Sequence, residues 1–395
     1  MLNTPFSPWP SFSVEEADAV RNLLLTNRVN YWTGAEGREF ENQFAAYTGS
    51  SYAIALANGT VALDVALNAL GIEPDDEVIV TSRTFIASVS SVVNAGAIPV
   101  FADVDLDSGN VTAETILAVL TDRTKAVICV HLAGWPCDMD PIMRLAEKNG
   151  LHVIEDCAQA HGASYKGRNV GSIGDIGVWS FCQDKIISTG GEGGMVTTNN
   201  ENLWSRMWSY KDHGKSWDAI YVRKHPVGYR WVHESFGTNW RMTEMQAAIG
   251  RIQLGRLDDW HSARVSNSTQ ILQICRQFPS VFRVSVPDAK FEHAYYKCYV
   301  YVRPDLLSVD WTRDYIIEAI NSRGVPCYSG TCSEVYLEKA FDGLGFRPEC
   351  RLPVAKELGE TSLMFLVHPT MTADEIQKTC NVISEVAELA CKECK

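Results

Sequence analysis

The stretch that decides the fold is residues 176–194, which read IGVWSFCQDKIISTGGEGG. A short apolar run ends at Ser180, a single lysine follows at Lys185, and four of the last five residues are glycine. Glycine lets another group approach the backbone closely. This pattern favours a lysine held beside a bulky planar ligand, because a lysine that forms a Schiff base must be partly buried with room for its cofactor. A surface lysine before a turn is the alternative interpretation.

The sequence around this stretch alternates short β-branched apolar runs with helical runs. Strands alternating with helices predict right-handed crossovers and a mostly parallel sheet. Ligands bind such sheets at the carboxyl ends of the strands, where Asn58, Asp156 and Ser180 fall. The predicted strands are 52–57, 77–81, 98–102, 126–130, 152–156 and 176–181, and the predicted helices between them are 61–70, 88–94, 113–120 and 140–149.

We predict two domains and an N-terminal arm: an arm at 1–12, a large domain at 13–261 and a small C-terminal α+β domain at 262–395. Ser13 and Glu16 have the spacing of a capping box at the start of a first helix. Further helices are expected at 37–47, 201–210 and 243–259, with a long functional loop at 211–239. The small domain should contain a strand at 295–302 and helices at 312–323 and 372–390.

The composition is that of a globular protein, with 395 residues, 46% hydrophobic and 21% charged. We expect neither a membrane span nor secretion, because no apolar run approaches about 20 residues and the N-terminus lacks a signal pattern. The expected location is the cytoplasm. The net charge of −13 argues against a nucleic-acid partner.

The twelve cysteines indicate a reduced protein, since most of them lie in apolar runs. Cys391 and Cys394 form the only C-x-x-C pair, and no second pair completes a four-ligand zinc site. We therefore expect no metal.

Two motifs place polar groups near the lysine. Asp156 ends a predicted buried strand and could pair with the ring nitrogen of pyridoxal phosphate, which would make the ring an electron sink. Gln159 could reach the phenolic oxygen of the same ring. The alternative for Asp156 is a helix cap or turn.

Three further motifs are weak when taken alone. Gly59 and Thr60 open a helix after a strand, where free N–H groups and the helix dipole form an anion site, although a plain strand-to-helix turn has the same sequence. Phe85 follows a strand and could stack on a flat cofactor or belong to the core. Asn239 lies in a polar segment, 237–244, that precedes a helix.

Together, these motifs resemble the DegT/StrS-type sugar-nucleotide aminotransferase family, of the fold-type I pyridoxal phosphate enzymes. The Glu-Asp pair at 155–156, the Gly-Ser-x-Gly-Asp segment at 171–175 and the Ser-Phe, lysine and Gly-Glu-Gly-Gly run carry the resemblance, which extends from about residue 6 to residue 370. Lys185 favours transamination, because members with histidine there dehydrate the sugar. An extra glycine at 190–191 indicates a subgroup.

The resemblance implies the role of each residue. Lys185 would bond to the cofactor and move the proton between cofactor and sugar, and Asp156 would hold the pyridinium. Gln159 would bind the phenolic oxygen, Phe85 would stack on the ring, and Gly59, Thr60 and Ser180 would bind the phosphate. Asn239 would reach the cofactor of the neighbouring subunit, which requires a homodimer with shared active sites.

The resemblance is greatest to enzymes that aminate the C4 ketone of UDP-linked 4-keto-6-deoxy-N-acetylglucosamine in bacillosamine-type pathways, with glutamate as donor. A dTDP or GDP sugar, or a C3 ketone, is the alternative, and a non-catalytic regulatory protein with this fold is a remote third. Candidate substrate contacts are Tyr31, Trp32, Thr33, His213, Lys215, Arg230 and His293.

Overall fold

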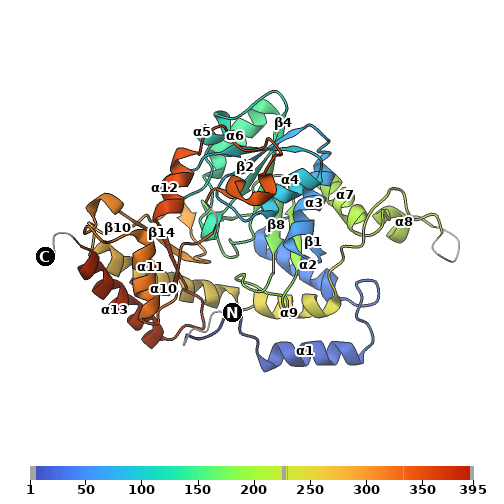
Figure 1. Cartoon of the computed structure of the whole chain (residues 1–395). Coiled ribbons are helices and arrows are strands. Elements are labelled where there is room, and N and C mark those ends of the chain that lie inside the picture. Colours follow the sequence, from blue (N-terminus) through green and yellow to red (C-terminus); the bar gives the residue numbers. More distant parts are fainter. Residues whose placement is uncertain (1–5, 225–227, 229, 332, 392–395) are drawn as a thin grey trace.

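The computed structural model describes residues 6–224, 228, 230–331 and 333–391. Its main feature is a seven-stranded sheet in the order β1-β9-β8-β5-β4-β2-β3, in which β9 alone runs antiparallel to its neighbours. Figure 1 shows the sheet surrounded by helices. The strands are β1 (Tyr52–Leu56), β2 (Glu77–Thr81), β3 (Ile98–Ala102), β4 (Thr124–Val130), β5 (His152–Asp156), β8 (Ile176–Ser180) and β9 (Gly194–Thr198). The predicted α/β class with a mostly parallel mixed sheet is confirmed.

Helices cover both faces of this sheet because alternate side chains of each buried strand point to opposite sides. Ile54, Val80 and Ile154 belong to one core, which packs against α3, α4 and α7. Val127 and Val153 point to the other face and pack against α5 and α6, while α2 and α9 cover that face nearer β1. The helices are α2 (Glu36–Thr48), α3 (Gly59–Leu70), α4 (Ala87–Asn94), α5 (Ala113–Leu117), α6 (Met139–Asn149), α7 (Glu201–Lys211) and α9 (Glu244–Leu254).

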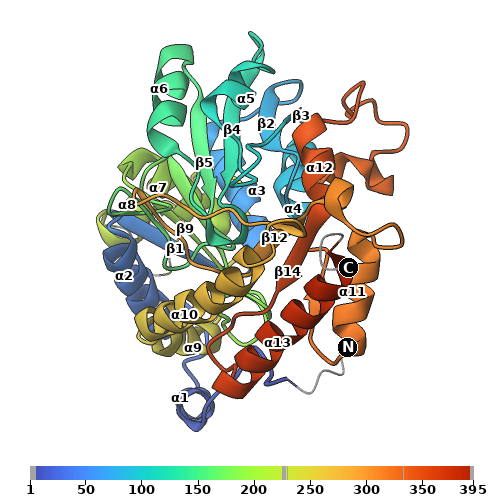
Figure 2. The same cartoon turned by 90° about the vertical axis from the view of Figure 1, so that its left-hand side faces the viewer.

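The C-terminal part forms a second core around a four-stranded sheet in the order β10-β12-β14-β13. The strands are β10 (Phe282–Arg283), β12 (Cys298–Val302), β13 (Cys327–Tyr328) and β14 (Ser362–Phe365), and the helices are α10 (Leu257–Arg276), α11 (Arg313–Ser322), α12 (Pro353–Thr361) and α13 (Ala373–Ala390). Figure 2 shows α10, α11 and α13 beside this sheet. A third sheet, β11-β6-β7, joins β11 (Phe291–Glu292) to β6 (Ser164–Tyr165) and β7 (Arg168–Asn169), so the two parts share a strand pairing.

The helix predicted at 243–259 and the strand predicted at 295–302 differ from the structure. The helix expected at 243–259 is two helices, because α9 ends before Gly255 and α10 begins at Leu257. Helix α10 runs unbroken from Leu257 to Arg276 and so passes through the domain boundary predicted between residues 261 and 262. The strand expected from residue 295 begins at Cys298, since the positive φ of 45° at Tyr295 interrupts an extended chain.

The N-terminal arm, residues 6–12 of which are described, connects the two cores. Phe6 is buried in the core of the C-terminal part, and the indole of Trp9 contacts the rings of Trp260 and His368. The Trp9 indole N–H donates to the carbonyl of Lys185 at 2.9 Å. Helix α1 (Val14–Leu25) follows, with the predicted Ser13–Glu16 capping box present.

Within the described residues, no helix is long and apolar enough to cross a bilayer. Of the ten described cysteines, eight are buried, Cys182 is partly buried and Cys350 is exposed. Cys394 lies outside the described residues.

Candidate active site

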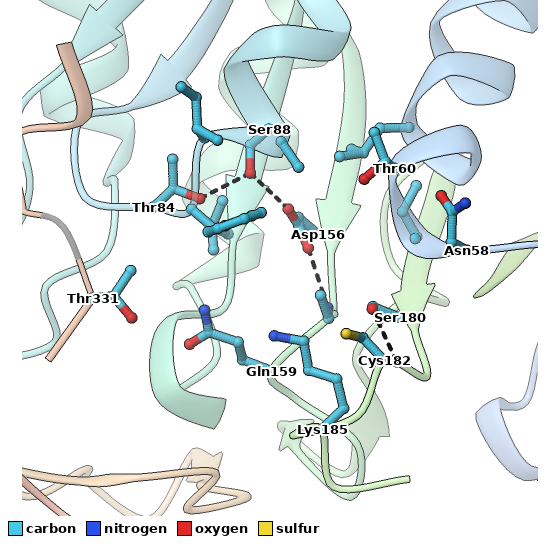
Figure 3. A pocket seen from close by; sticks show the side chains of 18 of the residues that line it. Asn58, Thr60, Thr84, Ser88, Asp156, Gln159, Ser180, Cys182, Lys185 and Thr331 are labelled. Carbon is cyan, nitrogen blue, oxygen red and sulfur yellow. Dashed lines mark hydrogen bonds between the residues drawn. The ribbon is translucent and has the colours of Figure 1, made fainter. Parts of the chain in front are cut away.

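A cavity of about 840 Å³ opens at the carboxyl ends of β2, β5 and β8 and beside the start of α3. It contains seven of the predicted site residues, which are Gly59, Thr60, Phe85, Asp156, Gln159, Ser180 and Lys185. These residues are distant in sequence and meet because parallel strands end at one edge of the sheet. Figure 3 shows the side chains that converge on this space.

Lys185 lies in the turn after β8, where its backbone N–H donates to the carbonyl of Cys182 at 3.1 Å. Its side chain is only 17% exposed, and its amine points into the cavity that Asp156 and Gln159 also face (Figure 3). The amine lies 3.8 Å from a carboxylate oxygen of Asp184 and 5.0 Å from the ring centre of Tyr296. The lysine therefore has the partial burial and open space that Schiff-base chemistry requires.

Asp156 ends β5 as a buried carboxylate, 6% exposed, at the floor of the cavity. One oxygen accepts from the Ala158 backbone N–H at 3.1 Å and the other from the Ser88 hydroxyl at 2.9 Å, while Ser88 in turn bonds Thr84 at 2.8 Å. Burial raises the pKa of Asp156, and these hydrogen bonds offset the rise only in part. A buried anion of this kind is stabilised by a cationic ligand group placed against it.

Gln159 and Phe85 form further walls. The Gln159 carbonyl oxygen accepts from the backbone N–H of Ala133 at 2.8 Å, which orients the amide and leaves its NH₂ group as the donor for a ligand. Phe85 lines the cavity with 64% of its surface exposed, so an aromatic face is offered to whatever fills the space.

The start of α3 has the features of an anion site. Asn58 caps this twelve-residue helix by accepting from the Val61 N–H at 3.0 Å, and Gly59 and Thr60 follow with their backbone N–H groups at the cavity. A Cβ on Gly59 would lie 2.7 Å from the Cβ of Ser180. Only glycine therefore lets the helix approach β8 this closely, and Thr60 and Ser180 line the same cavity as a result.

Glu155, the neighbour of Asp156, has a structural role. Its fully buried carboxylate accepts from His131 Nε2 at 3.1 Å and from the backbone N–H groups of Gly171, Ile173 and Gly174 at 2.9, 2.8 and 2.7 Å. Burial alone would raise the pKa of Glu155, but these hydrogen bonds outweigh it and lower the pKa. The side chain thus fixes the 171–174 turn to the strand that carries Asp156. Among the described residues, His131, Glu155 and Cys157 are the one group close enough to share a metal ion, and these bonds already occupy the Glu155 oxygens.

Sequence reasoning missed the wall that the C-terminal part supplies. Tyr296, Thr331, Val335 and Glu338 line the cavity, and the Val335 N–H donates to the carbonyl of Ser82 at 2.9 Å, which holds this segment on the large domain. No sequence signal pointed to these residues, because the pairing of the two parts brings them to the site. Ser88, Asp184 and Cys182 could have been found, since each lies within four residues of a predicted site residue.

Two of the predicted substrate contacts are enclosed elsewhere. Tyr31 is 1% exposed, and its hydroxyl donates to Glu41 at 3.0 Å. His293 is buried and lines a separate cavity of about 30 Å³, and its ring stacks on that of Tyr295 with the ring centres 4.0 Å apart. Neither side chain faces the large cavity, so the structure gives no support to a substrate contact by Tyr31 or His293 in this chain.

The remaining predicted contacts do not line the cavity. Asn239 pairs with Asp212 and Lys215 pairs with His233 through antiparallel bridges, so the described residues of the 211–239 segment form a folded extension rather than a plain loop. It contains the short helix α8 (Trp217–Tyr221), which projects from the body of the molecule in Figure 1. The Lys215 amine lies 4.3 Å from the ring centre of Trp32. Thr33, His213 and Arg230 likewise line no part of the cavity among the described residues.

The cavity fits pyridoxal phosphate at each of its functional groups. An amine for its aldehyde, a buried carboxylate for its ring nitrogen, an exposed aromatic face and a helix N-terminus for its phosphate all border one space. Fold and site together define a pyridoxal phosphate enzyme.

Comparisons with known proteins identify the family. Residues 10–384 match the DegT/DnrJ/EryC1/StrS aminotransferase family, and the chain belongs to it. It is 34% identical to GDP-perosamine synthase of Escherichia coli O157:H7, over 95% of this chain and 96% of that one. It is also 34% identical to the UDP-N-acetyl-3-dehydro-alpha-D-glucosamine 3-aminotransferase of Acidithiobacillus ferrooxidans, over 91% of this chain and 90% of that one.

Solved structures agree with this placement. An aminotransferase from Psychrobacter cryohalolentis superposes with a TM-score of 0.96 at 66% identity, covering 97% of this chain and 98% of the other. DesV of S. venezuelae, solved with a ketimine intermediate, has a TM-score of 0.84 at 32% identity and covers 95% of each chain. The protein is therefore an aminotransferase, and its cofactor is pyridoxal phosphate.

Proposed function

We propose that the enzyme transfers an amino group from L-glutamate to the C4 ketone of a nucleotide-linked 4-keto-6-deoxy sugar, UDP-2-acetamido-2,6-dideoxy-4-hexulose, in the cytoplasm. The product would serve the synthesis of bacterial surface glycans. The observation that supports amino transfer is that the Lys185 amine faces the cavity that also contains the Asp156 carboxylate. The C4 position and the UDP group rest on the resemblance of the sequence to enzymes of bacillosamine-type pathways.

Bound pyridoxal phosphate would accept the amino group from the donor and supply an electron sink for the carbanion formed when a proton leaves. Lys185 Nζ would move a proton from the α-carbon of glutamate to the cofactor in the first half-reaction, and from the cofactor to the sugar carbon in the second. Asp156 would keep the ring nitrogen protonated, and Gln159 would donate to the phenolic oxygen. The α3 N-terminus with Ser180 would hold the phosphate and so fix the ring against Phe85.

We further propose a homodimer in which each active site takes residues from both chains. Among the described residues, Lys185 is the only cation that lines the large cavity, whereas Asp156, Asp184, Glu192 and Glu338 supply four carboxylates. A cofactor phosphate and an anionic substrate need more positive charge than this. Asn239, Lys215 and Arg230 of the 211–239 extension, with Trp32 and Thr33 beside it, would supply polar and cationic groups to the neighbouring chain's cavity.

A GDP- or dTDP-linked sugar, or a C3 ketone, is the second candidate. The names of two relatives support this second candidate, because one relative is a GDP-perosamine synthase and the other is a 3-aminotransferase of a UDP sugar.

The test converts the enzyme to its pyridoxamine form with glutamate and mixes it with UDP, GDP and dTDP keto sugars in separate reactions. Return of the absorbance of the lysine-linked cofactor with the UDP-linked N-acetyl 4-keto-6-deoxy sugar alone is the expected result. Return with another sugar keeps the transfer and replaces the substrate. Lys185→Ala should reduce turnover by at least about four orders of magnitude, and a variant with substantial activity would contradict the role of the lysine.

A further inference from the structure

The backbone of Lys185 lies in the irregular segment between β8 and β9. Its N–H donates to the Cys182 carbonyl within the same segment, and the two side chains that follow, Ile186 and Ile187, are buried in the core. A reacting group on an irregular segment is placed less precisely than one on a helix or strand, unless other contacts fix that segment. The position of the amine therefore depends in part on what holds the Lys185 carbonyl.

The N-terminal arm supplies the contact to this carbonyl. The Trp9 indole N–H donates to the Lys185 carbonyl at 2.9 Å, and among the described residues this is the one hydrogen bond that the carbonyl accepts. An indole has a single donor and no acceptor, so the direction of the contact is defined. A partner from a distant part of the sequence thus satisfies the backbone group that the local turn leaves open.

Three side chains hold the Trp9 ring in place. Its centre lies 5.1 Å from that of Trp260, in an edge-to-face arrangement, and 6.0 Å from that of His368, in a stacked arrangement. The guanidinium of Arg264, which is 1% exposed, lies 5.1 Å from the centre of the Trp9 ring. A ring that is contacted from several sides presents its N–H in one direction.

The residues that precede Trp9 anchor the arm to the C-terminal part. Phe6 is buried in the core of that part, and the Pro8 carbonyl accepts from the Thr370 hydroxyl at 2.8 Å. The indole is therefore carried by a segment that is fixed on both sides of the chain's two cores, and its contact with Lys185 joins the C-terminal part to the backbone of the lysine.

A second contact from the C-terminal part holds the residue before the lysine. The Tyr296 hydroxyl donates to the Asp184 carboxylate, and Arg264 donates to the Tyr296 carbonyl at 3.2 Å. Arg264 thus contacts both the tyrosine that binds Asp184 and the indole that binds Lys185. Tyr296 also lines the active-site cavity, so Trp9 is the residue at which positioning can be tested without altering a wall of that cavity.

We propose that Trp9 is a positioning residue for Lys185, whose carbonyl it fixes so that the amine faces the reacting atoms. The inference rests on the proposed role of Lys185 and extends it to a residue of the arm that does not line the large cavity. Trp9 acts through the backbone of the lysine. The alternative is that Trp9 only stabilises the packing of the arm against the rest of the chain.

The experiment compares two variants that each remove one indole N–H from the same aromatic cluster. Trp9→Phe keeps a ring and removes the donor to Lys185, whereas Trp260→Phe leaves that hydrogen bond intact. Cofactor-free protein is mixed with pyridoxal phosphate, and the absorbance of the lysine-linked cofactor is followed as it forms. We expect its rate of formation to fall about tenfold in Trp9→Phe and by less than about twofold in Trp260→Phe. Equal rates in the two variants would overturn the proposal.

A double-mutant cycle separates positioning from a purely structural role. The dissociation constant of pyridoxal phosphate is measured by equilibrium dialysis with Lys185 present and in a Lys185→Ala background. Trp9→Phe should raise this constant about tenfold when the lysine is present and by less than about twofold when the lysine is absent. Equal increases in both backgrounds would assign Trp9 to the stability of the fold alone and would overturn the proposal.

Turnover distinguishes this inference from the proposed function. In single turnover with glutamate, Trp9→Phe should lower the limiting rate about tenfold and leave the glutamate concentration for half-maximal rate within about twofold of wild type. Substantial turnover in Lys185→Ala would end the proposed role of the lysine, and this inference with it. If Lys185→Ala lost turnover while Trp9→Phe kept the wild-type rate, the role of Trp9 alone would be wrong.

Discussion

Replacing Asp156 by Asn isolates the effect of one buried charge with little change of shape. The Asn oxygen can keep the hydrogen bond from the Ala158 N–H, and its NH₂ can donate to the Ser88 hydroxyl, which then donates to Thr84 instead of to residue 156. The substitution therefore removes the anion opposite the ring nitrogen while every local hydrogen bond keeps a partner. We expect the variant to fold and to bind the cofactor.

The rate of the glutamate half-reaction should fall by about two to four orders of magnitude. Removing one partner of a buried ion pair costs about 3–5 kcal/mol, and each 1.36 kcal/mol in the barrier is a factor of ten. The assay is a single-turnover stopped-flow measurement of the loss of lysine-linked cofactor absorbance after mixing with saturating glutamate. A rate within tenfold of wild type, with cofactor bound, would refute the pairing of Asp156 with the ring.

The same substitution should leave the cofactor-free protein at least as stable as wild type at pH 7.5. The folded-state pKa of Asp156 is raised by burial, so its ionised form destabilises the folded protein at every pH above the ordinary carboxyl range. The advantage of the Asn variant should shrink as the pH falls toward about 4, where the carboxyl takes up its proton in both states. Melting temperatures of the two cofactor-free proteins across this range test the sign, and an Asn variant that melts lower at pH 7.5 would contradict it.

Two further predictions concern the supports of the site. Gly59→Ala should weaken cofactor binding by about tenfold or more, because the new Cβ would lie 2.7 Å from the Cβ of Ser180 and push α3 away from β8. The control is Gly255→Ala, whose Cβ would meet no atom nearer than 3.4 Å. Equal cofactor affinities of the two variants in a titration would contradict the close approach. Glu155→Gln should lower the free energy of unfolding by about 3–6 kcal/mol, since either amide orientation turns an NH₂ toward two buried donors. Urea unfolding against the exposed control Glu147→Gln measures it, and a loss under about 1 kcal/mol would show that Glu155 is not the anchor described.

The sequence predicted the sheet well where burial alone defines a strand. The expected strands at 77–81, 98–102 and 152–156 coincide with β2, β3 and β5, because strands buried on both faces are continuous apolar runs. Strand β9 was not predicted, since it follows the glycine-rich run directly. Its antiparallel position between β1 and β8 depends on its partners and produces no pattern in its own sequence.

The sequence predicted those site residues that lie at the carboxyl ends of the parallel strands. Asp156, Gln159 and Ser180 could be placed together because each follows a parallel strand, whereas Tyr296 depends on how the C-terminal part packs. The single helix predicted at 243–259 is divided at Gly255, because glycine is a poor helix former and the packing around it, which the sequence does not show, decides where a helix ends.

The position of β9 has a consequence for how the protein is made. As the chain leaves the ribosome, β1 emerges early, but its partner β9 follows only after nearly all of the large sheet has been synthesised. Until then one margin of the nascent sheet is open to other chains, since an unpaired strand edge is a template for association. The hairpin that closes this margin joins β8 to β9 and contains Lys185. The step that protects the growing chain from aggregation is thus the step that sets the reactive amine in place, so a molecule that fails to close its sheet also fails to acquire its chemistry.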